Sequence, residues 1–342
     1  MGTRVLALLA LHAVAGMSSS AQAAPMKAVI PNFPIRTQWE HGHGYCGELS
    51  IQQTALTRGV WVGQQQARNI GGGEVLLGRP GSNLNNLQKV LQALGFDFVV
   101  WDPDSEAGQG IPTSYMRWMK QQIIAGRAAI FGARLQDGED DAWYDHIMPA
   151  YGIYYDSSTA GQYDARDTLT WTDNYGTVAN KTMSDESFYA EQYNCEMPQD
   201  TYSGCIPLGA DTFATAMGGL LDARKLFLPL RLIITGWSNG AEADSEPRVN
   251  ANPPASARYR LAFQPGANVR PGNKFAVHRC DRAANGSGGP PANPTDASQL
   301  AAAGCRSWDF TMNSSTLPQL SHRALGVLWS NSIVYYVATR QQ

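Results

Sequence analysis

The cysteines are the feature that most constrains the fold of this chain, because their number is odd. The sequence contains five of them. Cys195 and Cys205 lie close together with turn-forming residues between them, and Cys280 and Cys305 flank a segment rich in Gly, Pro and Asn. We expect these four to form two local disulfides, Cys195–Cys205 and Cys280–Cys305, although four cysteines allow three pairings. Cys46 then remains as a free thiol.

The amino-terminal residues 1–24 have the pattern of a signal peptide. Arg4 gives a short positive region, residues 5–17 are almost wholly apolar, and residues 21–23 form a small-x-small cleavage site. The apolar run is too short to span a membrane, and no later stretch is long enough. We therefore expect a secreted, soluble mature chain in an oxidising compartment, extracellular or periplasmic, where disulfides persist. The sequons at Asn180, Asn285 and Asn313 would make it a glycoprotein in a eukaryotic host.

Composition limits the class of protein and the number of domains. The chain has 342 residues, of which 43% are hydrophobic and 16% charged, with a formal net charge of -3. These values are typical of a well-packed globular protein of about two domains. Because the sequence contains no Lys/Arg run or basic stripe, we expect neither nucleic acid nor a membrane as a partner.

The first part of the mature chain has the pattern of an α+β fold. Apolar residues recur at helical spacing in residues 46–56, 84–94 and 115–123. Strand patterns cover residues 96–101, 128–132, 146–155 and 168–173, and the last two resemble an antiparallel pair. Helices lead and strands follow, which predicts a helix packed on an antiparallel sheet.

The sequence changes character near residue 240. Short alternating strands are predicted at residues 259–263, 274–278, 308–312 and 332–337, separated by turns rich in Pro, Gly and Asn. This is the pattern of a small sandwich. We therefore expect a first domain over residues 25–240 and a β-rich accessory domain over residues 241–342. Aromatic residues of the second domain are core residues, or they contact a carbohydrate or protein surface.

Cys46 is placed where a thiol is reactive. It begins the first predicted helix, where free N–H groups and the positive end of the helix dipole stabilise a thiolate. The small neighbours Gly44 and Gly47 allow a substrate backbone to come close. The alternative is that Cys46 forms half of a disulfide.

His146 and Asp173 supply the other groups that a cysteine nucleophile needs. His146 begins one of the paired strands and Asp173 ends the other, so antiparallel pairing brings imidazole and carboxylate to one edge of the sheet. A base that takes the thiol proton, oriented by a third polar group, completes a catalytic triad. The alternatives are a structural histidine bonded to Asp145 or a backbone carbonyl, and a plain turn at residues 173–176.

The order of these motifs resembles a known family. Gly-Tyr-Cys-Gly starts a helix at residues 44–47, and Gly-Phe, Gly-Arg-x-Ala-Ile, His-Ile-x-x-x-Tyr-Gly and Trp-Thr-Asp-Asn-Tyr-Gly follow at residues 95–96, 126–130, 146–152 and 171–176. Over residues 32–180 the chain resembles the papain-like cysteine peptidases, most of all their bacteriocin-leader-processing (double-glycine) branch. The resemblance implies Cys46 as nucleophile, His146 as base and Asp173 as the orienting carboxylate.

One position departs from that family. Its members usually have a glutamine about six residues before the cysteine, whose amide helps to bind the oxyanion. Glu40 stands there in this chain, and Gln38 lies eight residues before Cys46. Gln38 can serve only if the intervening loop bulges by two residues, which Gly42 and Gly44 permit. Otherwise Gln38 is a polar loop residue.

His41 and His43 offer a metal-binding alternative, since they precede Cys46 as His-x-His. Three ligands within six residues do not have the spacing of a structural zinc site, and a metal would quench the thiolate. We therefore expect no metal and no cofactor, and we interpret both histidines as residues that shape the loop.

The sequence thus predicts a secreted thiol hydrolase, a cysteine peptidase that cleaves amide bonds of a peptide or protein substrate. The first alternative is an acyltransferase of the transglutaminase type that uses the same residues. The second is a non-catalytic secreted binding module that retains the fold.

Overall fold

The computed structural model describes residues 25–39, 44–78, 83–103, 111–136, 143–182, 189–190, 204–207, 213–247, 255–264, 267–283, 288–291, 293–294, 296–312, 320–321 and 325–341. The helices are α1 (Cys46–Leu56), α2 (Gln64–Gly71), α3 (Asn86–Ala93), α4 (Ile111–Ile124) and α5 (Ser298–Ala302), with a 3-10 turn η2 (Ser157–Thr159). Strands of the first half are β1 (Pro25–Val29), β2 (Val60–Val62), β3 (Phe96–Val100), β4 (Ala128–Gln136), β5 (Trp143–Asp156), β6 (Thr168–Thr172), β7 (Val178–Thr182), β8 (Tyr189–Ala190), β9 (Gly204–Pro207) and β10 (Ala214–Leu220). Strands of the second half are β11 (Phe227–Leu228), β12 (Leu230–Trp237), β13 (Ala257–Phe263), β14 (Lys274–Arg282), β15 (Arg306–Thr311), β16 (Leu320–Ser321) and β17 (Ile333–Arg340).

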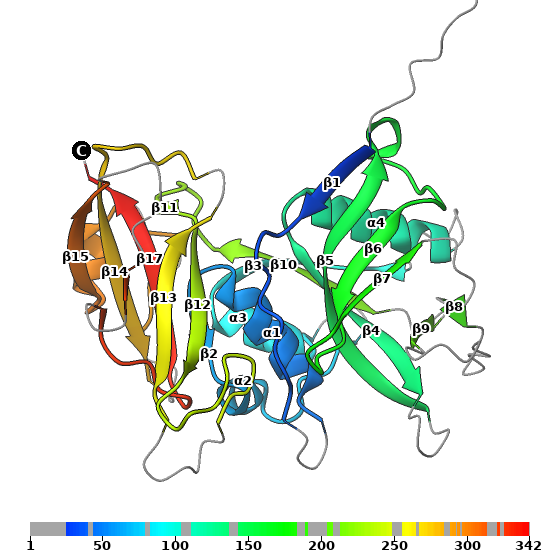
Figure 1. The fold of residues 1–342 in the computed structure, drawn as a ribbon, viewed down its shortest axis with the longest axis horizontal. Helices are drawn as coiled ribbons and strands as arrows, with labels where there is room; N and C mark the ends of the chain where they lie inside the picture. Colours follow the sequence, from blue (N-terminus) through cyan, green and yellow to red (C-terminus); the bar gives the residue numbers. More distant parts are fainter. Residues whose placement is uncertain are drawn as a thin grey trace, which may run out of the picture.

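The first sheet confirms the predicted α+β architecture. Its strands follow the order β3-β10-β4-β5-β6-β7, and β1 also pairs with β5. The pairing of β5 with β6 is antiparallel, as the sequence predicts. Helix α4 lies on this sheet, and its Met116 and Met119 share a core with Phe131 of β4 and Trp171 of β6 (Figure 1).

The second half of the chain forms two further sheets. One has the order β11-β17-β14-β15, with β2 also paired to β17, and the other has the order β12-β13-β16. Leu232 and Leu261 of the smaller sheet share a core with Val277 and Tyr336 of the larger one. The C-terminal region is therefore β-rich, with two sheets that face each other (Figure 1).

Strand pairing crosses the predicted domain boundary near residue 240. The strands β2, β11 and β12 all precede that residue, yet each pairs within the C-terminal sheets. Leu56 and Trp61 also belong to the core between these sheets. The division at residue 240 stays a prediction, and the two regions share packing on both sides of it.

Helix α1 lies between the first sheet and the C-terminal sheets (Figure 1). All its residues from Gly47 to Leu56 are buried. Ile51 packs in a core that includes Ile147 of β5 as well as Ile333 of β17. The helix is therefore enclosed by elements from both halves of the chain.

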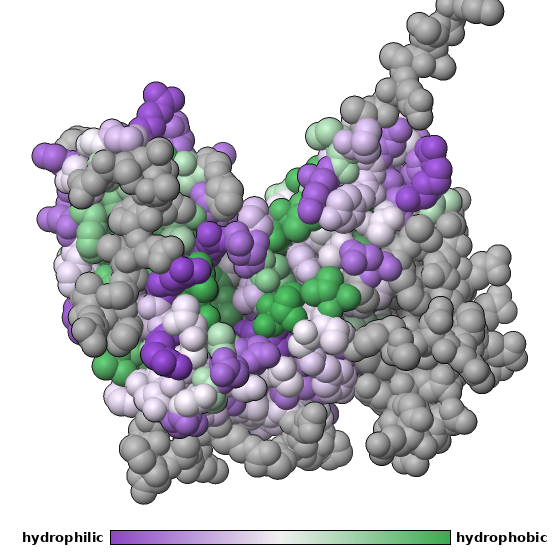
Figure 2. All heavy atoms as spheres, in the orientation of Figure 1, coloured by the Kyte–Doolittle hydropathy of each residue, from purple (hydrophilic) through white to green (hydrophobic). Residues whose placement is uncertain are grey.

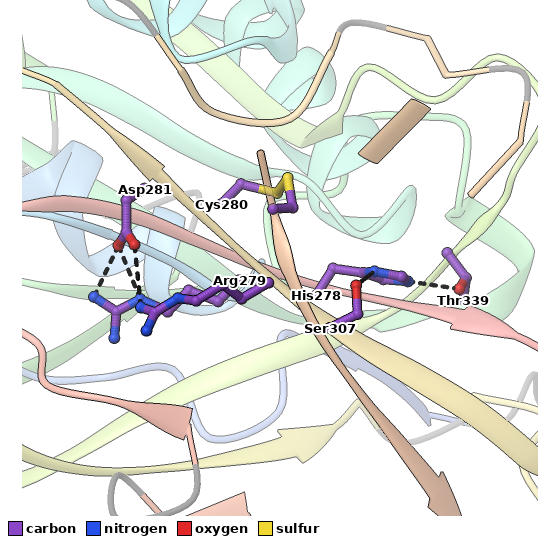
Figure 3. Close-up of a disulfide and its surroundings, with 8 residues drawn as sticks. His278, Arg279, Cys280, Asp281, Ser307 and Thr339 are labelled. Atoms are coloured by element: carbon purple, nitrogen blue, oxygen red, sulfur yellow. Dashed lines mark hydrogen bonds and ion pairs between the residues drawn. A yellow bond between two sulfur atoms is a disulfide. The ribbon is translucent and has the colours of Figure 1, made fainter. Parts of the chain in front are cut away.

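The predicted disulfide between Cys280 and Cys305 is confirmed. It links β14 to the residue that precedes β15, and both cysteines are buried. Figure 3 shows His278 beside this disulfide. Its two ring nitrogens form hydrogen bonds with the hydroxyl groups of Ser307 on β15 and Thr339 on β17. Cys195 lies outside the described residues, and the side chain of Cys205 is not described, so the Cys195–Cys205 pairing stays a prediction.

Other sequence expectations fall partly outside the described chain. The signal peptide at residues 1–24 and the sequons at Asn285 and Asn313 lie outside it, whereas Asn180 is exposed on β7. Among the described helices, none is both long and apolar enough to cross a membrane.

Truncation after Gly240 tests how far the two regions depend on each other. We expect a chain of residues 25–240 to lose cooperative thermal unfolding, because β2 and β12 lose their strand partners and Leu56 and Trp61 become exposed. Exposing a large apolar side chain costs about 1.5–3 kcal/mol. Thermal melts by circular dichroism and binding of a hydrophobic dye measure this, with residues 25–342 as control. A soluble, cooperatively folded truncated chain would contradict it.

Candidate active site

Cys46 is the first residue of α1, and it is a free cysteine with intermediate exposure of the residue as a whole. Burial raises the pKa of the thiol to about 11, and the charge of Glu48 acts in the same direction. Backbone hydrogen bonds from Ile147, Gly47 and Cys46 itself oppose the rise. The thiol therefore lies against the backbone of the residue that follows His146. It is protonated at neutral pH and needs a base to ionise it.

The turn before Cys46 is held by Arg68 of α2. Its guanidinium bonds the carbonyl of Gly44 at 2.5 Å, lies 3.5 Å from the ring centroid of Tyr45, and pairs with the buried carboxylate of Glu48 at 2.6 Å. Glu48 also accepts a hydrogen bond from the N–H of Val75. These contacts fix the first turn of the helix before any substrate binds.

Gly47 allows a close backbone approach, but from within the chain. A Cβ atom at this position would lie 1.9 Å from the carbonyl oxygen of Val75. The residue must therefore be glycine for the segment after α2 to pass over the start of α1. The sequence interpretation assigned this space to a substrate, whereas the protein's own backbone fills it.

His146 is buried on β5 and is held by the backbone of Asp173. Its Nε2 lies 2.7 Å from the carbonyl oxygen of Asp173. Since a carbonyl only accepts, Nε2 carries the proton in the neutral ring, and the lone pair is on Nδ1. Burial lowers the pKa of His146, while the carbonyl and the charge of Asp173 oppose that shift. The ring of Tyr175 stacks on the imidazole at 5.3 Å between centroids.

The carboxylate of Asp173 makes different contacts from those expected. Its Oδ1 accepts hydrogen bonds from the N–H groups of Tyr175 and Thr177 at 2.9 and 3.0 Å, and its Oδ2 accepts one from the Thr177 hydroxyl at 2.6 Å. The side chain thus shapes the turn between β6 and β7. It is the backbone carbonyl of Asp173, rather than the carboxylate, that accepts the hydrogen bond from Nε2 of His146.

Asn174 is the site residue that sequence reasoning missed. It is fully buried and has a φ of 67°. Its Nδ2 lies 3.0 Å from the carbonyl oxygen of Cys46, 2.7 Å from that of Ile147 and 3.0 Å from the hydroxyl of Ser50. Its Oδ1 accepts a hydrogen bond from Gln53 at 2.6 Å. The sequence marked Asn174 as a turn former, but the partners of its side chain are distant in sequence.

Gln38 lies beside the start of α1. Its backbone N–H bonds the carbonyl of Asn174 at 2.9 Å, and its Nε2 bonds the hydroxyl of Tyr175 at 3.1 Å. A Cβ atom built on Gly44 would be 3.6 Å from Nε2 of Gln38. The buried amide therefore sits next to the turn that leads into Cys46. Its role toward an oxyanion stays a prediction.

The segment that carries Gln38 is anchored from beyond residue 240. Thr37 donates its N–H to the carbonyl of Asp244, and the indole of Trp39 donates to the carbonyl of Glu246. The Glu246 carboxylate accepts from Gln52 of α1 at 2.7 Å, and Gln52 accepts from Arg36 at 2.8 Å.

Charges in this anchor are buried. Burial raises the pKa of Glu246 to about 7 and lowers that of Arg36 to about 10, and the attraction between them opposes both shifts. Both side chains are almost completely enclosed. The network therefore joins α1, the Gln38 segment and residues 244–246 into one unit.

The metal-binding alternative falls mostly outside the described chain. His41, His43 and Glu40 lie there. Within the described residues, no group of three His, Cys, Asp or Glu side chains could hold a metal ion.

A cavity of about 460 Å³ lies away from the predicted site residues. It is lined by Leu56 and Thr57 at the other end of α1, together with Arg231 and Arg260. Figure 2 shows the molecule hollowed between its two halves, where polar and apolar side chains meet.

The pH dependence of Cys46 alkylation tests the resting state of the thiol. With His146 replaced by alanine, we expect the rate with iodoacetamide to rise with an apparent pKa near 11, because no base then assists the buried thiol. At pH 8 the folded His146→Ala variant should then react roughly 100-fold more slowly than the same thiol in the unfolded chain. The urea-unfolded protein is the control. A midpoint at about pH 8.5 in the folded variant would contradict this expectation, because the thiol would then ionise as it does in the unfolded chain.

Comparisons of this chain with protein families, with curated proteins and with solved structures find no match.

Proposed function

We propose that this protein is a secreted thiol hydrolase, a cysteine peptidase of papain-like fold. The observation that carries the proposal is the meeting of three distant segments. The start of α1 is joined to the residue after His146, because Ser50 and Asn174 both bond the carbonyls of Cys46 and Ile147. The β6–β7 turn holds the histidine through Nε2. A cysteine at a helix start and an imidazole with its lone pair on Nδ1, carried by the residue before Ile147, are the groups that nucleophilic catalysis requires.

The proposed reaction begins with transfer of the Cys46 thiol proton to Nδ1 of His146. The imidazolium then donates from Nε2 to the Asp173 carbonyl, and the nearby carboxylate stabilises its positive charge. The thiolate attacks an amide carbonyl, the C–N bond breaks as His146 protonates the leaving amine, and an acyl-enzyme forms. Water, deprotonated by His146, then releases the acid and the free thiol.

The oxyanion would be bound by two N–H groups near the thiol. The backbone N–H of Cys46 lies in the first turn of α1, where such groups have no partner within the helix. The amide of Gln38 has two N–H bonds, and the Tyr175 hydroxyl accepts only one. Donors fixed before the reaction stabilise the tetrahedral intermediate without reorganisation.

Secretion is part of the same proposal. The Cys280–Cys305 disulfide is compatible with an oxidising compartment, and the amino-terminal pattern of the sequence supports export. The substrate would then be an extracellular or periplasmic peptide or protein.

The reaction class is tested by product analysis. The protein is first labelled with an epoxide inhibitor and mapped, which should place the label on Cys46. It is then incubated with an unfolded protein, with and without a primary amine. New amino termini in both samples support hydrolysis. Amine incorporation without cleavage would indicate an acyltransferase, and an unlabelled Cys46 with no product would leave a non-catalytic module.

Substitutions at the triad should have unequal effects. We expect Cys46→Ala and His146→Ala to lower kcat by at least about 10⁴-fold, because each removes a reacting group. Asp173→Ala should lower it by only roughly 10-fold, since the backbone carbonyl that holds His146 remains while the turn loosens. Steady-state kinetics on a cleaved peptide measures these effects. Complete loss in a folded Asp173→Ala variant would assign the carboxylate a larger role.

Gln38→Ala tests the oxyanion donor. We expect kcat to fall roughly 100-fold with little change in KM, because the amide acts on charge that develops in the transition state. Gln65→Ala is a matched control, since Gln65 bonds the hydroxyl of Tyr45 on the α2 side of the site. Equal kinetics for Gln38→Ala and the unmodified protein would remove Gln38 from the mechanism.

A further inference from the structure

We propose that Asn174 is a positioning residue that sets the Cys46 thiol against His146. This inference rests on the proposed function, because it assigns Asn174 a role within the thiol–imidazole pair. Asn174 is proposed to act through the backbone near the two reacting groups, at the carbonyls of Cys46 and Ile147. Its side chain joins the carbonyl of Cys46, the residue of the nucleophile, to the carbonyl of Ile147, the residue that follows the base.

The contacts of Asn174 account for this joining. Its Nδ2 bonds the carbonyl of Cys46 at 3.0 Å and that of Ile147 at 2.7 Å, so one amide group spans the first turn of α1 and strand β5. Ser50 supports both ends, because its hydroxyl lies 2.7 Å from the Cys46 carbonyl and 3.1 Å from the Ile147 carbonyl.

Ile147, whose carbonyl accepts a hydrogen bond from Asn174, also donates its N–H toward the sulfur of Cys46. The backbone hydrogen bond from Ile147 is the strongest of the influences that lower the pKa of the Cys46 thiol. Because Ile147 directly follows His146, the clamp on its carbonyl restrains both the N–H that faces the thiol and the backbone that carries the imidazole. A displacement of about 1 Å at a reacting pair can cost roughly 100-fold in rate.

The backbone of Asn174 serves the same site. Its φ of 67° is in the left-handed region, which asparagine tolerates better than most residues. This conformation lets the preceding carbonyl bond His146 while the Asn174 carbonyl accepts from Gln38. Asparagine thus meets two requirements at this position. It accepts a left-handed backbone, and its amide donates to two carbonyls while it accepts from Gln53.

The two requirements can be separated by substitution. Asn174→Gly keeps the left-handed backbone and removes the Nδ2 hydrogen bonds to the carbonyls of Cys46 and Ile147. Asn174→Asp keeps an acceptor for Gln53 but replaces the Nδ2 donor. Asn32→Gly is a matched control, because Asn32 is also left-handed, with a φ of 51°, but is exposed and outside the site. Circular dichroism at the assay temperature verifies that each variant is folded.

The test is a double-mutant cycle on the rate of Cys46 alkylation by iodoacetamide at pH 7. If Asn174 aligns the thiol with its base, Asn174→Gly and Asn174→Asp each lower the rate roughly 10- to 100-fold, and His146→Ala lowers it similarly. The double variant Asn174→Gly/His146→Ala should then react no more slowly than His146→Ala alone, because there is no longer a base to align. Asn32→Gly should have no effect.

Three outcomes would overturn the inference, and they differ from one another. In the first, the effects of the two substitutions on the rate simply multiply, so that Asn174→Gly slows alkylation by the same factor with and without His146. Asn174 then has only a structural role, and the thiol–imidazole pair is still supported. If His146→Ala leaves alkylation unchanged, the pair itself fails, and the proposed function fails with it. A rate for Asn174→Asp equal to that of the unmodified protein would also contradict the inference, since that variant lacks the donor.

Discussion

The burial of α1 is the constraint on which the rest of the structure depends. A helix enclosed on all sides would ordinarily be apolar, yet Glu48, Ser50, Gln52 and Gln53 are all buried in it. A buried polar group must find a partner or cost free energy. The partners here come from α2, β5, the β6–β7 turn and the segment around Glu246. These directional contacts favour one rotation and depth of the helix, and they thereby fix the position of Cys46.

The β6–β7 turn applies the same principle from the opposite side. Asp173 gives its carbonyl to His146 and its carboxylate to the turn itself, Asn174 bonds the backbone at Cys46, and Tyr175 both stacks on His146 and bonds Gln38. Three consecutive residues thus bring together segments more than a hundred residues apart. Each of the three side chains has a partner set that another residue type would not satisfy, so the turn is specified by tertiary contacts as much as by its local propensity.

Local patterns in the sequence predicted what is local in the structure. The helix at Cys46, the β5–β6 pair and the Cys280–Cys305 disulfide follow from periodicity and spacing, and they were anticipated. What was missed is non-local. Strand β2 is only three residues long and is defined by its pairing with β17, far along the chain. The contact between His146 and the backbone of Asp173 depends on how the turn folds, which residue types alone do not reveal. The buried partners of Asn174 have no sequence signature for the same reason.

The anchor at Glu246 links the two halves of the chain physically. Because folding raises the pKa of Glu246 from 4.5 to about 7, its contribution to stability is fully present below about pH 4.5 and is lost as the pH rises through 7. Above that pH the protein keeps a buried carboxylate, which Arg36 and Gln52 must stabilise. An apolar anchor would avoid that cost. The charged anchor instead holds the Gln38 segment, α1 and the region after residue 240 in one hydrogen-bond geometry. The position of the predicted oxyanion donor Gln38 therefore depends on the chain that leads into the C-terminal sheets.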